Sequence, residues 1–125
     1  MPVELAELVG PGRPAVLTME IQRGVVGDLS SFPALADEVD RRGVVENTAR
    51  LLAGARRAGV PVVHCTAGFR SDRRGSPSNA PLMTAVLRRP EHLLEGTGAV
   101  ELVPELGAQA DDLMSHRRHG VSPFV

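Results

Sequence analysis

Charged side chains stand where two apolar segments end, and these are the residues that could do chemistry. Glu20 closes one apolar run, and His116, Arg117, Arg118 and His119, the His-Arg cluster, close another. A carboxylate beside an apolar segment is costly unless it is paired or belongs to a site, so Glu20 is a candidate general base. The alternative is a salt bridge to Arg117 or Arg118 that only neutralises it. The cluster is either a site for an anionic substrate group or a solvated turn.

Cys65 is the single cysteine of the chain and stands next to His64. The pair suggests a nucleophile and its base. Adjacent residues of a strand point to opposite faces of a sheet, however, so the two side chains cannot easily meet. We therefore predict a buried, inert thiol, and a single cysteine allows no disulfide within the chain.

Missing residue types narrow the chemistry further. All 14 basic residues are Arg, so no mechanism can use a lysine amine of this chain. Trp and Tyr are also absent, which removes stacking platforms for nucleic-acid bases. The histidines lack the helical spacing of a metal motif, and the glycines around Gly96 and Gly98 do not form a phosphate loop. We expect no metal and no other cofactor.

Length and charge are typical of one soluble domain. The chain has 125 residues, of which 42% are apolar, and a formal net charge of -1, so we assign a single domain to residues 1–125. This charge balance predicts no nucleic-acid partner, and the apolar runs are too short to cross a membrane. The N-terminus lacks a signal-peptide pattern, so we expect a cytoplasmic protein.

Five segments have a clear secondary-structure pattern. Apolar runs bounded by Gly and Pro predict strands at 14–22 and 60–66, with a weaker third strand at 112–116. Apolar residues at three- and four-residue spacing predict an amphipathic helix over 44–59. Residues 81–89 have the pattern of a shorter helix. The order strand, long helix, strand predicts an α/β fold with a parallel sheet. Residues 67–81 predict a long loop of the kind that covers a site.

Four motifs resemble those of the isochorismatase-like hydrolases, also called the cysteine hydrolase superfamily. In chain order they are PAVLTMEIQRG, VENTARLLAGARRAGVPVVHC, GTGAVELVPELG and DLMSHRRHGVSPF. The resemblance implies a parallel, doubly wound, Rossmann-like sheet of about six strands, with the active site at the carboxyl ends of the strands. By this resemblance the chain covers the N-terminal part of the fold, which is incomplete at its C-terminus.

The resemblance also implies a catalytic triad of Asp, Lys and Cys that hydrolyses an amide or imide through an acyl-enzyme. Glu20 stands at the Asp position, where its carboxylate reaches roughly 1.5 Å further from the backbone. Arg117 or Arg118 stands at the Lys position and keeps the positive charge, but an Arg cannot shuttle a proton. The Cys position lies beyond Val125. Glu20, Arg117 and Arg118 are therefore the catalytic candidates.

Three further residues are candidates for contact with the substrate, Gln22, His119 and Phe124. Gln22 follows Glu20 closely, and we favour hydrogen bonds to the backbone near the strand end as its role over substrate contact. His119 belongs to the His-Arg cluster. Phe124 closes the segment that resembles the family's Ser-Ala-Phe motif.

These observations leave several functions open. The first is a hydrolase of a C–N bond in a small amide-like substrate, whose nucleophile comes from a complementing chain or a further C-terminal portion. The second is a catalytically degenerate relative that binds a small ligand or assembles with another subunit, and the third is a truncated product of a longer reading frame. Because the first strand would be an unpaired edge, we expect a homo-oligomer or a complex with a complementing chain.

Overall fold

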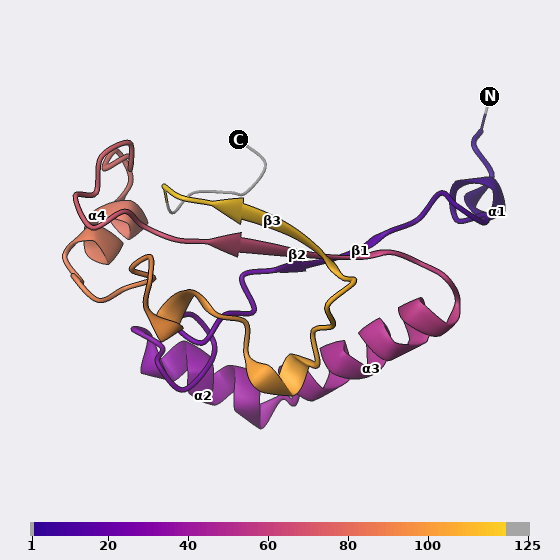
Figure 1. The fold of residues 1–125 in the computed structure, drawn as a ribbon, viewed down its shortest axis with the longest axis horizontal. Coiled ribbons are helices and arrows are strands. Elements are labelled where there is room, and N and C mark those ends of the chain that lie inside the picture. The colour runs from indigo at the N-terminus through magenta and orange to yellow at the C-terminus, as the bar shows by residue number, and fades with distance from the viewer. Residues whose placement is uncertain (1, 120–125) are drawn as a thin grey trace.

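The computed structural model describes residues 2–119, and in this part of the chain three parallel strands form one sheet. They are β1 (Val16–Met19), β2 (Val62–Ala67) and β3 (Leu113–Arg117), in the order β1-β2-β3 (Figure 1). The register places Thr18 of β1 opposite His64, and Thr66 of β2 opposite His116. The predicted α/β fold with a parallel sheet is confirmed, and the three strands lie where the sequence pattern predicts them.

The chain also forms helices before β1 and between the strands. α3 (Val44–Arg57) corresponds to the predicted long helix, and Gly59, with a φ of 69°, turns the chain after it. α4 (Pro81–Leu87) corresponds to the predicted short helix. The remaining elements were not predicted: α1 (Leu5–Leu8), α2 (Pro33–Arg41) and the 3₁₀ turns η1 (Gly98–Val100) and η2 (Pro104–Leu106). No helix within residues 2–119 is long and apolar enough to cross a membrane.

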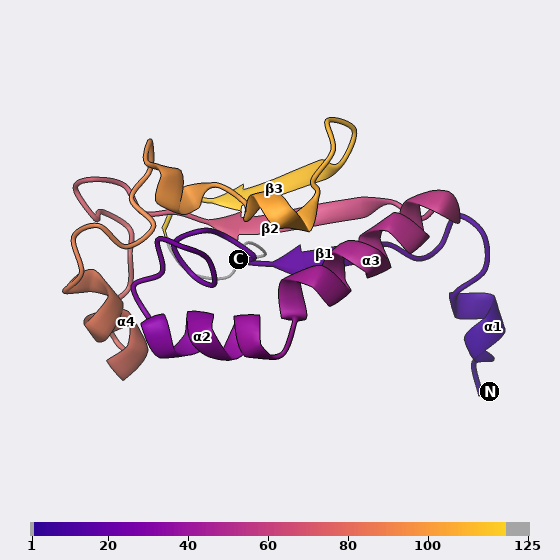
Figure 2. The same ribbon diagram turned by 90° about the horizontal axis from the view of Figure 1, so that it is seen from below.

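The helices α2 and α3 lie on the same side of the sheet, as Figures 1 and 2 show together. Leu52 and Ala55 of α3 are buried against Val62 of β2 and Leu106 of η2. A second buried cluster, made by Ala67, Phe69, Val86 and Leu93, fixes the segments that follow β2. Burial of these aliphatic faces holds the strands in register and so positions the residues at their ends.

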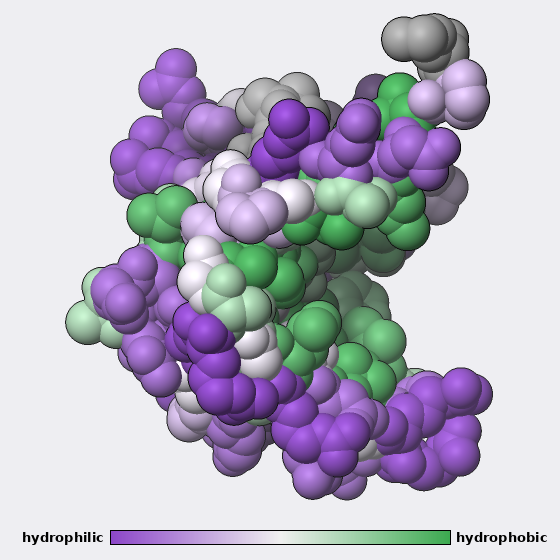
Figure 3. Space-filling model, turned by 90° about the vertical axis from the view of Figure 1, so that its right-hand side faces the viewer, coloured by the Kyte–Doolittle hydropathy of each residue, from purple (hydrophilic) through white to green (hydrophobic). Residues whose placement is uncertain are grey.

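The opposite face of the sheet is open at several positions. Leu17 and Met19 of β1 are 44% and 46% exposed, and Leu113 of β3 is 57% exposed. The helix side of the sheet is not fully closed either: Figure 3, which looks at the end of the molecule next to α1, shows apolar side chains in a hollow between the upper part, which contains the sheet, and the lower part, which contains α2 and α3. Within the described residues, the molecule therefore has helices α2 and α3 on one face of the sheet only.

The outer edge of β1 is also free. Val16 donates its N–H to Pro61 O and Glu20 donates to Cys65 O, so these alternate residues direct their backbone groups toward β2. Leu17 and Met19, between them, direct theirs away from β2. In the part of the chain that the structure describes, β1 pairs with β2 alone, so this edge can accept another strand.

Candidate active site

Glu20 lies at the carboxyl end of β1 in a strained position. Its φ is 54°, in the left-handed region that a non-glycine residue seldom adopts. The side chain is half-buried, and desolvation by burial raises the pKa of its carboxyl above the usual 4.5. No hydrogen bond or ion pair to this carboxylate is found within residues 2–119. A strained, partly desolvated and unpaired carboxylate is the arrangement expected of a general base rather than of a structural residue.

Arg117 closes β3, and its guanidinium also has no partner among residues 2–119. Its Nε and Nη1 are buried, and neither has a hydrogen-bond partner among the described residues. The backbone of Arg117 is held in place, because its carbonyl accepts a hydrogen bond of 2.7 Å from Gly68 N–H. A buried guanidinium normally pairs with an anion, so Arg117 has unused capacity to bind one.

Arg118 is engaged differently. Its Nε donates to Glu95 Oε2 at 3.0 Å, and 61% of its side chain is exposed. Neither Arg117 nor Arg118 pairs with Glu20 within the described part of the chain, so the alternative of a neutralising salt bridge is not found among these residues. The prediction that Arg118 is catalytic stays a prediction, and the geometry favours Arg117 for that role.

Glu95 connects Arg118 to a row of hydrogen-bonded side chains at the carboxyl ends of β2 and β3. His116 Nε2 lies 2.8 Å from Glu95 Oε1, and His116 Nδ1 lies 2.8 Å from Thr66 Oγ1. The pKa of Glu95 is lowered overall, because the hydrogen bonds from His116 and Arg118 outweigh a desolvation that acts in the opposite direction. A Cβ at Gly68 would lie 3.1 Å from the His116 ring, so this close approach favours a glycine. Both ring nitrogens of His116 therefore have a hydrogen-bond partner within this row.

Gln22 is fully buried just beyond Glu20. Its Nε2 donates to Ala67 O and to Val100 O, both at 2.8 Å, and its Oε1 accepts from Ala67 N–H at 2.9 Å. Gln22 therefore joins the end of β2 to η1, which is the backbone-bonding role that we favoured. Contact between Gln22 and a substrate stays a prediction.

His119 lies against the loop that follows β2. Its Nδ1 is 3.2 Å from Arg74 O, and a Cβ at Gly75 would lie 2.8 Å from the same nitrogen. The 67–81 loop thus packs against the end of the third strand, near the candidate site. Phe124 lies outside the described residues, and its substrate contact stays a prediction.

Cys65 and His64 do not form a catalytic pair. Cys65 is fully buried, and this burial raises the pKa of its thiol. His64 Nδ1 is 2.8 Å from Thr18 Oγ1, and its Nε2 is 2.9 Å from Asp112 Oδ2, so both ring nitrogens are engaged. The predicted burial of the thiol is confirmed, and its inertness stays a prediction.

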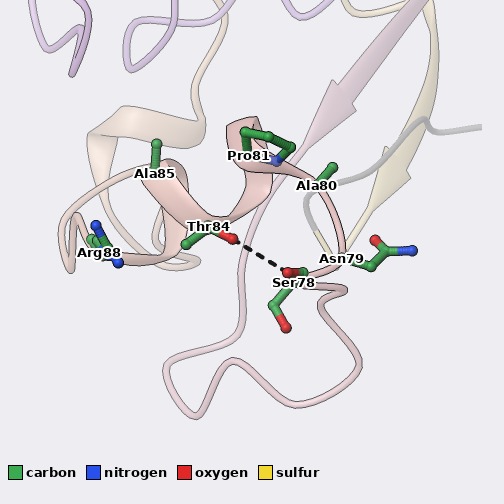
Figure 4. A pocket seen from close by; sticks show the side chains of 7 residues that line it. All are labelled: Ser78, Asn79, Ala80, Pro81, Thr84, Ala85 and Arg88. Carbon is green, nitrogen blue, oxygen red and sulfur yellow. Dashed lines mark hydrogen bonds between the residues drawn. The ribbon is translucent and has the colours of Figure 1, made fainter.

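A second pocket lies outside the candidate site. The start of α4 has a shallow pocket of about 460 Å³, in which Thr84 donates to Ser78 O at 3.2 Å (Figure 4). Arg88 is the single ionisable side chain among its lining residues, so the pocket holds no catalytic set. No group of three or more His, Cys, Asp or Glu side chains that could hold a metal ion is found within residues 2–119.

Comparison with known proteins decides the family. The model of the isochorismatase domain matches residues 14–125, which is nearly all of the chain. The chain belongs to the isochorismatase family. No curated protein matches it.

Solved structures of this family share the fold. An isochorismatase family protein from Desulfovibrio vulgaris matches with a TM-score of 0.59 at 22% identity, over 80% of this chain and 50% of its own. N-carbamoylsarcosine amidase from Thermoplasma acidophilum matches with 0.58 at 20% identity, over 89% and 54%. A cysteine hydrolase from Pseudomonas syringae pv. phaseolicola matches with 0.60 at 23% identity, over 83% and 46%. This isochorismatase-family chain therefore spans about half the length of the structures that it matches.

Sequence reasoning missed two residues of the site, Thr66 and Glu95. Thr66 looks like an ordinary β-branched strand residue, and Glu95 stands in an irregular stretch more than 20 positions before its partners. The one available signal is the acidic Glu95 directly after the apolar Leu93 and Leu94.

Proposed function

We propose that the carboxyl edge of this sheet is one half of a hydrolase site that acts on a C–N bond of a small amide-like substrate. Glu20 is the general base, and the Arg117 guanidinium stabilises the negative charge that develops on the nucleophile or the carbonyl oxygen. One observation carries the proposal: within residues 2–119, Glu20 and Arg117 both lack partners, whereas Arg118, His116 and Glu95 bind one another.

The proposed reaction needs a thiol that this chain does not place at the site. Glu20 takes the thiol proton, the thiolate attacks the carbonyl carbon, and the amine leaves with a proton. Water then hydrolyses the thioester and restores the thiol. Cys65 is buried and has a raised pKa, so it does not supply this thiol.

In this proposal, the nucleophile comes from a polypeptide segment that completes the sheet. The free edge of β1 and the exposed Leu17 and Met19 support this placement, because they offer unpaired backbone groups and apolar surface beside Glu20. The N-carbamoylsarcosine amidase among the structural neighbours supports an amide-like substrate.

A second candidate is a relative that binds a small anionic ligand without hydrolysing it. The observation that favours it is the chemistry of Arg117. An Arg in place of the family's Lys holds an anion through two parallel hydrogen bonds but does not exchange protons at neutral pH.

The test uses the native assembly, with its chains identified by native mass spectrometry. Ammonia release from small primary amides and N-carbamoyl amino acids is measured for the unmodified protein and for Glu20→Gln, Glu20→Asp, Arg117→Met and Glu4→Gln. We expect Glu20→Gln to lower kcat by roughly 100-fold or more, Glu20→Asp to keep most activity, and Glu4→Gln to change nothing. Unchanged turnover in Glu20→Gln contradicts the hydrolase assignment, and calorimetric binding that depends on Arg117 without turnover supports the second candidate.

A further inference from the structure

A large groove, whose lining contains none of the candidate site residues, lies between the helix layer and the segments that flank it. It is formed by α2, α3, η2 and the loop after β1, and has a volume of about 1210 Å³. We call it the α2–α3 groove; Figure 2 shows α2 and α3 following each other along this side of the molecule. A typical small-molecule pocket has ~300–1,000 Å³, so the groove has room for a polypeptide segment.

The lining of the groove contains a set of small apolar side chains. They are Val26, Ala36, Val39, Val45, Ala49, Ala53 and Val103. All but Val103 are partly exposed, and short side chains on α3 leave space for a close approach by another backbone. The groove therefore offers an apolar contact surface that nothing within residues 2–119 covers completely.

Four carboxylates without ion-pair partners surround this surface. Asp37, Asp40, Glu46 and Glu105 all line the groove, and none forms a salt bridge with another described residue. The two cations of the lining, Arg23 and Arg50, balance the carboxylates only in part, because the lining holds five carboxylates against two guanidinium groups. Arg23 is already paired with Asp28 and Glu101, and Arg50 donates to the Asn47 side chain.

Local helix stability accounts for Glu46 but not for Asp40. Glu46 is in the first turn of α3, where the helix dipole favours an acid. Asp40, by contrast, is in the last turn of α2, where the dipole disfavours an acid. Asp37 and Asp40 are also three residues apart on one helix, so they repel each other. The acidic surface of α2 thus costs stability that a cationic partner would restore.

We propose that the α2–α3 groove docks an amphipathic helix of another protein, with small aliphatic side chains on one face and Lys or Arg along its flanks. The apolar face lies on the valines and alanines, and the flanking cations pair with the four carboxylates. The negative charge of the groove is complementary to such a helix. The same charge repels nucleic acid. This inference does not depend on the proposed hydrolase activity.

The test is fluorescence anisotropy with three labelled synthetic peptides. One is a helical peptide with an Ala/Leu face and Lys on both flanks, one is its scrambled isomer, and one carries Glu in place of Lys. The groove variant combines Asp37→Asn, Asp40→Asn, Glu46→Gln and Glu105→Gln. The control variant, with the same net charge, combines Glu4→Gln, Glu7→Gln, Glu91→Gln and Asp111→Asn, all at exposed positions outside the groove.

We expect the amphipathic Lys peptide to bind the native protein and the control variant with similar affinity. The groove variant should bind it at least about tenfold more weakly, and added salt should reduce the difference. The Glu peptide should not bind. To probe the apolar part, Ala53→Leu should weaken binding with the charges intact.

Several results overturn the proposal. Equal binding to the groove and control variants shows that the peptide binds elsewhere. Equal binding of the scrambled isomer, or full displacement by spermidine, shows attraction by charge alone. A change of oligomeric state that the groove variant abolishes assigns the groove to a second copy of this chain, and no binding at all excludes a docked cationic helix.

Discussion

Glu20 combines a left-handed backbone with a carboxylate that loses hydration and gains no partner in the described structure. Both features cost free energy of folding, and neither is explained by packing. Sites that bind or transform ligands commonly retain such costs, because the same group later interacts with the ligand. The backbone strain is independent of the side-chain chemistry, so substitution can separate the two.

We predict that Glu20→Gln stabilises the protein at neutral pH by up to about 1 kcal/mol, because it removes a desolvated charge. The folded-state pKa of Glu20 is raised, so the native state holds the proton more tightly than the unfolded state. The difference should therefore be small below pH 4.5 and grow as the pH rises through the folded-state pKa. Urea unfolding across this pH range measures the difference in stability, with Glu4→Gln as a control. A Glu20→Gln protein that is less stable than the unmodified one would contradict the conclusion that the Glu20 carboxylate is unpaired.

His92 is the second residue whose protonation bears on stability. Desolvation, with Arg73 and Arg89 nearby, lowers its pKa from 6.5 to about 4. The ring packs against Phe32 and Phe69 at centroid distances of 5.5 and 5.8 Å, and its Nδ1 is buried without a hydrogen-bond partner among the described residues. The folded state therefore requires the neutral ring.

We expect stability to fall as the pH drops from 6.5 toward 4, because the unfolded chain gains a proton there that the folded chain does not. From the size of the pKa shift of His92, the full loss in the free energy of unfolding is about 3 kcal/mol. His92→Leu should flatten the dependence in this window, whereas His119→Gln should leave it in place. Thermal melts at half-unit pH steps measure the slope, and an unchanged slope in His92→Leu would exclude His92 as its source.

At the scale of elements, hydrogen-bonded rows tie the three strands to each other and to the loops. The first row runs from Thr18 through His64 and Asp112 to Arg56 of α3. The second runs from Thr66 through His116 and Glu95 to Arg118. Both use a Thr on one strand and the His opposite it on the next. The first row is the more deeply buried, since the side chains of His64 and Asp112 are 0% and 5% exposed.

Asp112→Asn should destabilise the protein by about 3 kcal/mol, because it leaves Arg56 without its ion pair in a largely buried place. The Arg56 guanidinium holds the pKa of Asp112 well below its usual range, so this contribution is present at neutral pH and is lost as the pH falls through the folded-state pKa. Glu38→Gln is the matched comparison. It removes exposed ion pairs to Arg41 and Arg42, which water screens, so it should cost much less stability than Asp112→Asn. Similar losses of stability in the two variants would contradict the conclusion that burial makes the Asp112–Arg56 ion pair the stronger one.

The elements that could be predicted are those whose patterns reflect burial. β2 and α3 have apolar residues where the core needs them, and both were found at the predicted positions. α2 was missed because it is short and none of its residues is buried, so its few apolar residues form a stripe of only about two turns. The candidate site was predicted at Glu20 and in the His-Arg cluster. The pairing of Arg118 with Glu95 depends on an irregular segment folding back to β3, which periodicity cannot show.

At the scale of the whole molecule, the described structure has a core on one face of its sheet and open surface on the other. Leu17 lies at this open face and also on the free edge of β1, so it is the residue through which association can be tested. Leu35 on α2 is exposed to nearly the same extent, 45% against 44% for Leu17, and supplies a matched control.

We predict that Leu17→Lys shifts the native assembly toward smaller species, because a charge on a strand edge opposes pairing with another strand. Leu35→Lys should leave the assembly unchanged. Native mass spectrometry and light scattering over a range of concentrations measure the distribution. Identical distributions for Leu17→Lys and the unmodified protein would place the association surface elsewhere.

The parallel sheet also sets the order of events when the chain folds. Thr18 and His64 are 46 residues apart, and Thr66 and His116 are 50 apart, so each strand pair forms only after a long stretch of chain has closed. Closure of this length makes folding slow compared with that of helical proteins of the same size. The uncharged edge of β1 is exposed throughout that interval, and refolding yield should therefore depend on how quickly a proper strand partner reaches it before another unfolded chain does.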